Sequence, residues 1–142
     1  MYVEPIELNH PWKTKLTKAL SEIHYVDQDG LTIRPTGIGP TERNLLEITV
    51  CMLWLRKQNP RKTISKLCTS YGLKHQVERE MGHYVSNGSF IAAAILQGLK
   101  IQRCGSLNAY LALGKAKPLS VEDHREARQF LEEEFNMIEE HY

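Results

Sequence analysis

The sequence has few cysteines and no long apolar run. Its three cysteines, Cys51, Cys68 and Cys104, include no CxxC pair, which argues against a disulfide framework or a zinc ribbon and predicts reduced thiols. The longest apolar run, residues 45–55, is 11 residues long and contains Glu47, whereas a membrane-spanning helix needs about 20 apolar residues. We therefore expect a cytoplasmic protein that does not enter the membrane.

Signatures of export, catalysis and metal binding are also missing. The first residues contain no basic segment followed by an apolar one, so no signal peptide is expected. The six histidines form no HExxH pair, and there is no GxSxG motif or separated carboxylate pair. These absences predict a protein that is not an enzyme and that needs no metal and no cofactor.

What the sequence does have is a segregation of charge. The total is nearly balanced, with 18 Lys and Arg against 17 Asp and Glu, for a net charge of +1. Residues 1–55 carry a net −2, residues 56–117 carry 11 basic and 2 acidic side chains for a net +9, and residues 118–142 carry a net −6. A cationic block of this kind suits contact with a polyanion.

The length and composition predict one soluble domain. Hydrophobic residues make up 42% and charged residues 25% of the 142 residues, which is ordinary for a globular chain. We expect residues 1–58 to be a helical support, 60–114 a basic functional region and 118–142 an acidic C-terminal helix.

The first part of the chain is typical of two helices joined by a loop. Apolar residues at helical spacing predict a helix from Trp12 to about Val26. Residues 27–40 are rich in Gly and Pro, which indicates a loop with a short extended piece at residues 31–34. Thr41 is placed to cap a second, buried helix that runs to about Lys57.

The basic block is predicted to be mostly helical. Thr63 is placed to cap a helix over residues 64–71, and Gly72 to end it. A helix from about Leu73 would follow, and Ser86 or Asn87 would cap another over residues 90–97. For residues 99–114 a β-hairpin is favoured, with a short helix capped by Ser106 as the alternative.

A last helix over residues 121–138 completes the prediction. Ser120 begins a sequence that resembles a capping box. The helix could dock one face on the core, form a dimer seam, or lie across the basic block as an autoinhibitory segment. The expected fold is mainly α, a compact bundle of about six helices with a small β-hairpin.

Residues 63–81 resemble a helix-turn-helix DNA-binding unit. Cys68 matches the small position of the first helix, Gly72 the turn, and Leu73 the apolar residue after the turn, while Val77 falls one residue before the usual inward β-branched position. The resemblance covers about 20 residues. The alternative is that two ordinary core helices meet at a glycine.

The resemblance implies that the helix from Lys74 enters the major groove and that the hairpin acts as a wing. Flanking phosphate contacts would come from Arg56, Lys57, Arg61 and Lys62. The expected nucleic-acid-binding residues are Lys66, Lys74, His75, Gln76, Arg79, Lys100 and Arg103.

Together these features predict a DNA-binding protein without catalytic activity, in the style of a small transcriptional regulator or a bacterial or phage mobile-element accessory factor. A homodimer is an open alternative for its assembly. The rival function is an adaptor whose basic face binds an acidic partner protein. Tyr71, Tyr84 and Tyr110 are interspersed with basic residues, as in proteins that stack single-stranded bases, but the helical spacing of Tyr71 and Tyr84 favours the core.

Overall fold

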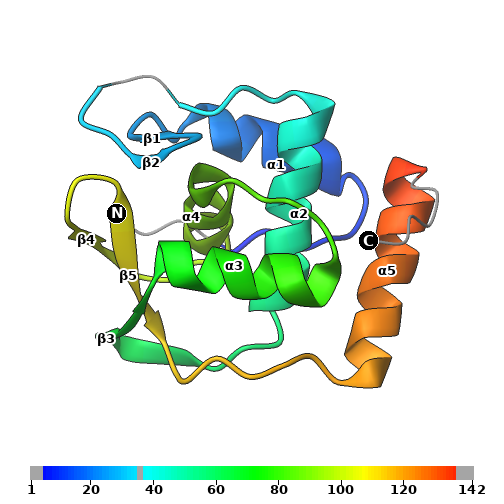
Figure 1. Cartoon of the computed structure of the whole chain (residues 1–142). Coiled ribbons are helices and arrows are strands. Elements are labelled where there is room, and N and C mark those ends of the chain that lie inside the picture. Colours follow the sequence, from blue (N-terminus) through cyan, green and yellow to red (C-terminus); the bar gives the residue numbers. More distant parts are fainter. Residues whose placement is uncertain (1–4, 35–36, 137–142) are drawn as a thin grey trace.

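A computed structural model describes residues 5–34 and 37–136 (Figure 1). Within these ranges the chain forms five helices and five strands. In chain order they are α1 (Trp12–Ser21), β1 (Val26–Asp27), β2 (Gly30–Leu31), α2 (Glu42–Leu55), β3 (Pro60–Thr69), α3 (Ser70–Met81), α4 (Asn87–Leu96), β4 (Ile101–Cys104), β5 (Asn108–Leu113) and α5 (Val121–Phe135).

Capping hydroxyls set where the main helices begin. The side chains of Thr41, Ser86 and Ser120 each accept a hydrogen bond from the backbone N–H three residues on, at the starts of α2, α4 and α5. Each bond satisfies one of the N–H groups that a helix start leaves without an intrahelical partner. The predicted caps at these three positions are confirmed.

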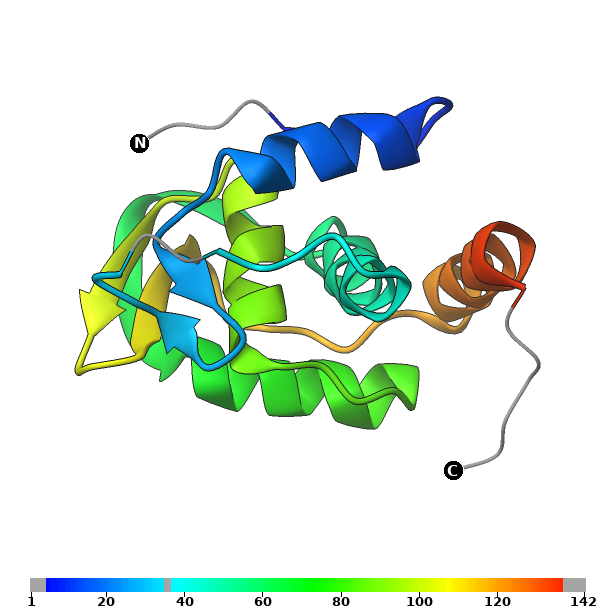
Figure 2. The same ribbon diagram turned by 90° about the horizontal axis from the view of Figure 1, so that it is seen from above.

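Helices α2 and α4 form the centre of the core. Every residue of α4 is buried, because the segment carries no charged side chain and can be covered on all sides. Trp54 of α2 packs against Phe90 of α4 with ring centroids 6.4 Å apart. Figure 2 shows α4 enclosed between α1, α2 and α3.

The acidic helix α5 docks by one face at the end of the molecule away from the three-stranded sheet (Figure 1). Ala127 and Leu131 are buried, and Phe130 packs on Trp12 of α1 at 5.5 Å between ring centroids. Through residue 135, α5 therefore does not lie across the strands of the basic block.

The strands form two antiparallel sheets. β1 pairs with β2, and a three-stranded sheet has the order β3-β5-β4. β3 pairs irregularly: Pro60 lies opposite Leu113 and Ser65 opposite Leu111, so β3 advances five residues while β5 advances two. Extra residues of this kind bend a strand, and β3 curves around the edge of the sheet in Figure 1.

The predicted six-helix bundle is wrong, because the described residues form an α/β mixture with 47% helix and 18% strand. The main error is the helix predicted over residues 64–71, most of which belongs to strand β3 (Pro60–Thr69). Apolar residues at helical spacing suggested a helix here, but Leu67 is 74% exposed. The backbone hydrogen bonds to β5 decide the local structure, and local spacing cannot reveal them.

Three smaller expectations also change. Gly72 lies inside α3 rather than at a turn, because Thr69 caps this helix directly after the strand. Helix α1 ends at Ser21, so Val26 begins a strand. The extended piece lies at Gly30–Leu31 instead of residues 31–34. The hairpin is confirmed as β4 and β5.

Candidate nucleic-acid interface

Helix α3 carries four of the residues expected to bind DNA, but the first of them is not available. Lys74 is only 6% exposed. Its Nζ donates to the Val85 carbonyl oxygen at 3.1 Å and lies 3.3 Å from Glu78 Oε1. A buried ammonium needs such partners to offset the loss of water. Lys74 therefore holds the loop after α3 and does not reach out to a phosphate.

The next two side chains of α3 contact carboxylates of the same helix. His75 Nδ1 lies 2.9 Å from Glu78 Oε1, and Gln76 Nε2 donates to Glu80 Oε2 at 3.2 Å. Arg79 is exposed on the same helix. With β3 in place of the first predicted helix, α3 is not presented as the second helix of a helix-turn-helix.

Exposed basic side chains gather instead on the three-stranded sheet. Lys66 Nζ lies 6.0 Å from the centre of the Tyr110 ring, and Tyr110 pairs with Gln102 across the sheet. Lys100 lies two residues before Gln102, on the same side by the alternation of a strand. Its Nζ donates to the Lys62 carbonyl oxygen at 3.2 Å.

We call this surface the outer face and define it by Lys66, Lys100, Gln102 and Tyr110. The three residues other than Tyr110 are exposed, and Tyr110 is half-buried. In Figure 2 the five helices lie to one side of the sheet. β3, β4 and β5 contain no acidic residue, so this face has a single sign of charge.

Arg103 lies at the hairpin rather than on the outer face. It follows Gln102 and so points to the other side of β4, and its Nη1 donates to the Ser106 carbonyl oxygen at 2.7 Å. Gly105 occupies the left-handed region with φ 69°, which a side chain would strain. Arg103 and Gly105 therefore keep the turn compact beside the sheet.

An open groove of about 740 Å³ lies where this hairpin meets the helices. Tyr71 and Tyr84 line it and are 52% and 55% exposed. The prediction that these two rings belong to the core is therefore wrong. Lys74 Nζ lies 5.6 Å from the Tyr71 ring centre and 5.0 Å from that of Tyr84.

The groove adjoins the outer face through Cys104. Cys104 lines the groove, and its side chain forms a hydrogen bond with Tyr110 that raises the pKa of the Tyr110 hydroxyl. Asn87 and Asn108 complete the polar lining, with Asn87 Nδ2 donating to Asn108 Oδ1 at 3.0 Å.

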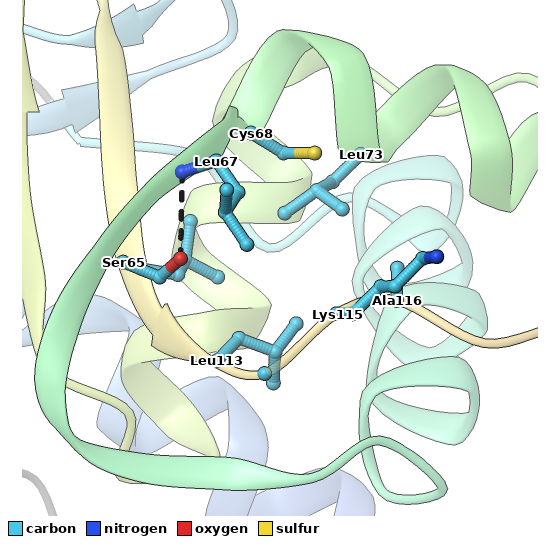
Figure 3. Close-up of a pocket in the computed structure, with 9 residues that line it drawn as sticks. Ser65, Leu67, Cys68, Leu73, Leu113, Lys115 and Ala116 are labelled. Atoms are coloured by element: carbon cyan, nitrogen blue, oxygen red, sulfur yellow. Dashed lines mark hydrogen bonds between the residues drawn. The ribbon is translucent and has the colours of Figure 1, made fainter.

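A second opening, shown in Figure 3, lies between β3, the start of α3 and the chain after β5. Leu67, Leu73 and Leu113 surround it, and Ser65 Oγ accepts a hydrogen bond from the Leu67 N–H. Its volume is about 50 Å³, far below the roughly 300–1,000 Å³ of small-molecule sites. It is a packing defect of the curved strand.

The thiols are free in the structure. Cys51 is buried, Cys68 exposed and Cys104 half-buried. Burial raises the pKa of the Cys51 thiol well above its ordinary value, and the Glu47 and Glu78 carboxylates raise it further. Among the described residues, no three His, Cys, Asp or Glu side chains converge on a point where a metal could bind.

The arrangement of the candidate residues could be predicted from the sequence only in part. Lys66 and Lys100 do come together on the outer face, whereas Lys74, His75 and Gln76 are engaged within α3 and Arg103 at the turn. The sequence analysis missed the groove, although tyrosines interspersed with basic residues were the signal for it.

No family model, curated protein or solved structure matches this chain. No helix in the described ranges has the length and apolar character to span a bilayer.

Proposed function

We propose that the protein binds DNA through the outer face of its three-stranded sheet, without catalytic activity. The observation that carries this proposal is the single sign of charge on β3, β4 and β5, where Lys66 lies beside Tyr110 and the ammonium of Lys100, just before β4, reaches the backbone of β3 at Lys62. Lysines contact phosphates as point charges, and release of the condensed counterions drives such binding.

The position of the two acidic residues in the basic block, residues 56–117, also supports DNA binding at the outer face. Glu78 and Glu80 both lie on α3, where they accept from Lys74, Gln76 and the Trp54 indole N–H. Their carboxylates are thus used inside the protein and are not on the strands that carry the lysines. The outer face keeps its positive charge.

Non-enzymatic DNA binding is what a small transcriptional regulator or a mobile-element accessory factor would need. Three free thiols fit a reducing compartment such as the cytoplasm. Phosphate contacts of this kind set the affinity for DNA and the position of the protein on the duplex.

The test is binding to a duplex of arbitrary sequence across a salt series. The variant Lys66→Ala/Lys100→Ala removes two charges from the outer face. Its control, Lys15→Ala/Lys18→Ala, removes two exposed charges from α1. Each phosphate contact contributes about 0.9 to the slope of log affinity against log salt. The sheet variant should therefore lower the slope by about 1.8, and the control should leave it close to that of the wild type.

Two results would contradict the proposal. Equal losses in both variants would mean that net charge, and not the outer face, governs binding. No binding of the wild type at about 50 mM salt, where the electrostatic contribution is large, would favour an acidic protein partner instead.

A further inference from the structure

The groove between α3 and the hairpin, defined by Tyr71, Lys74, Tyr84, Asn87 and Asn108, has the features of a ligand site. Its volume of about 740 Å³ falls in the range of small-molecule sites, about 300–1,000 Å³. Two half-exposed aromatic rings face it, and stacking on aromatic rings is how proteins hold planar bases without regard to sequence.

Lys74 supplies an unused donor at this groove. Its ammonium has three N–H groups, of which two point to Val85 and Glu78. No oxygen or nitrogen acceptor among residues 5–34 and 37–136 engages the third, and the nearest aromatic ring centres, those of Tyr84 and Tyr71, lie 5.0 and 5.6 Å from Nζ. The side chain is more than nine-tenths buried and lines the groove, so a ligand that accepts this hydrogen bond would satisfy a donor already removed from water.

The asparagines add further unpaired polar atoms. Asn108 uses its Oδ1 to accept from Asn87, and no described residue accepts from its Nδ2. Asn87 Oδ1 is buried and finds no donor within the described chain. Both donors and acceptors are thus present, as the edge of a nucleobase requires.

The charge of the groove favours a base over a phosphate. Glu78 already pairs with Lys74, and Asp29 stands at the lining, so the site offers little net positive charge. A phosphate would gain little here, whereas a neutral base with a carbonyl oxygen could accept from Lys74. The lysines of the outer face are better placed to bind phosphates, and this face adjoins the groove at Cys104.

We propose that this groove receives an unpaired base of the DNA strand held by the outer face, with the base stacked on Tyr71 and Tyr84 and its edge hydrogen bonded to Lys74. The proposal rests on the proposed DNA binding. It adds that the protein distinguishes unpaired bases from a fully paired duplex.

The experiment compares three probes on the full chain. The first is a blunt duplex, the second the same duplex with a six-nucleotide single-stranded overhang, and the third carries the same overhang without its bases. The last two have equal phosphate charge, so their difference reports base contacts alone. Stacking contributes about 1–3 kcal/mol per base, so the overhang with bases should bind about 5- to 150-fold more tightly than the abasic one.

Tyrosine variants assign the difference to the groove. Tyr84→Ala should reduce the preference for the probe with bases and leave the salt slope unchanged, because the outer face is intact. Tyr84→Phe keeps the ring and should retain most of the preference. Tyr84 is half-exposed, and a thermal melt of each variant shows that it is folded.

The outcomes separate the two proposals. If the wild type binds all three probes and does not distinguish the two overhangs, the groove proposal is overturned and DNA binding stands. A preference for bases that survives Tyr71→Ala/Tyr84→Ala would also overturn it. If no probe is bound, the proposed function itself fails.

Discussion

Replacement of Gly88 by alanine tests the packing that positions the groove. Gly88 lies in the first turn of α4, and helix propensity alone would predict a gain of about 0.8–1 kcal/mol. The structure predicts the opposite. A Cβ at this position would overlap the Asp27 carbonyl oxygen and lie 2.6 Å from the Asp27 carbonyl carbon and 2.9 Å from Gln28 Cα. These atoms belong to the backbone, which cannot relieve a clash by a change of rotamer as a side chain can.

The loss of stability follows from the displacement of the β1–β2 turn that the added Cβ would require. The β1–β2 turn is tied to α4 by the Gly88 N–H to Gln28 oxygen bond at 3.0 Å and by Asn87 Nδ2 to Asp29 oxygen at 3.0 Å. Losing both would cost about 1 kcal/mol each, and overpacking adds about 1–3 kcal/mol. After the gain of about 0.8–1 kcal/mol from helix propensity is subtracted, the expected net loss is about 2–4 kcal/mol.

Urea unfolding, followed by the fluorescence of the buried Trp12 and Trp54, measures this loss. The matched control is Gly39→Ala, where an added Cβ meets nothing within 4 Å; it should be neutral or gain up to about 1 kcal/mol. If the free energy of unfolding of Gly88→Ala lies within 1 kcal/mol of the wild-type value, the close approach of α4 to the β1–β2 turn is incorrect.

Two further predictions concern α3 and the core. Gly72→Ala should raise the free energy of unfolding by about 0.5–1 kcal/mol, because Gly72 lies inside α3 and its added Cβ would be 4.0 Å from Thr69 Oγ1; a loss in the same urea titration would support a left-handed turn at this residue. Cys51 should make the protein less stable in alkali. Its pKa is raised in the folded state, so above the ordinary value of 9.0 the unfolded thiol loses a proton that the folded one keeps. Stability then falls as pH rises, by about 1.4 kcal/mol at pH 10 from this thiol. Unfolding titrations at pH 8 and 10 should show a smaller decrease for Cys51→Ala, and an equal decrease would rule out this linkage.

Much of the secondary structure could be predicted because its causes are local. The caps at Thr41, Ser86 and Ser120 form from residues three positions apart, and the hairpin at residues 101–113 is set by a glycine turn between two short strands. The buried character of α4 follows from its lack of charge. Such features depend on neighbours in the chain and leave a pattern in the sequence.

The strand at residues 60–69 could not be predicted in this way. Its apolar residues at helical spacing suggested a buried face, and yet Leu67 and Cys68 are exposed. What stabilises β3 is its pairing with β5, some 40 residues further along the chain. Such a long-range pairing leaves no periodic signal in a bulged edge strand. The predicted helix-turn-helix geometry depended on this segment.

By itself, the sequence determined that positive charge gathers in residues 56–117 and that the acidic residues lie mainly elsewhere. Only the tertiary structure decided which of those charges face solvent. Lys74 is buried because its ammonium binds the Val85 carbonyl oxygen and the Glu78 carboxylate. Lys66 of β3 and Lys100, the residue before β4, are exposed on one sheet, which brings distant segments of the chain together. Charge is a property of composition, but a charged surface requires long-range contacts to place its side chains on one face.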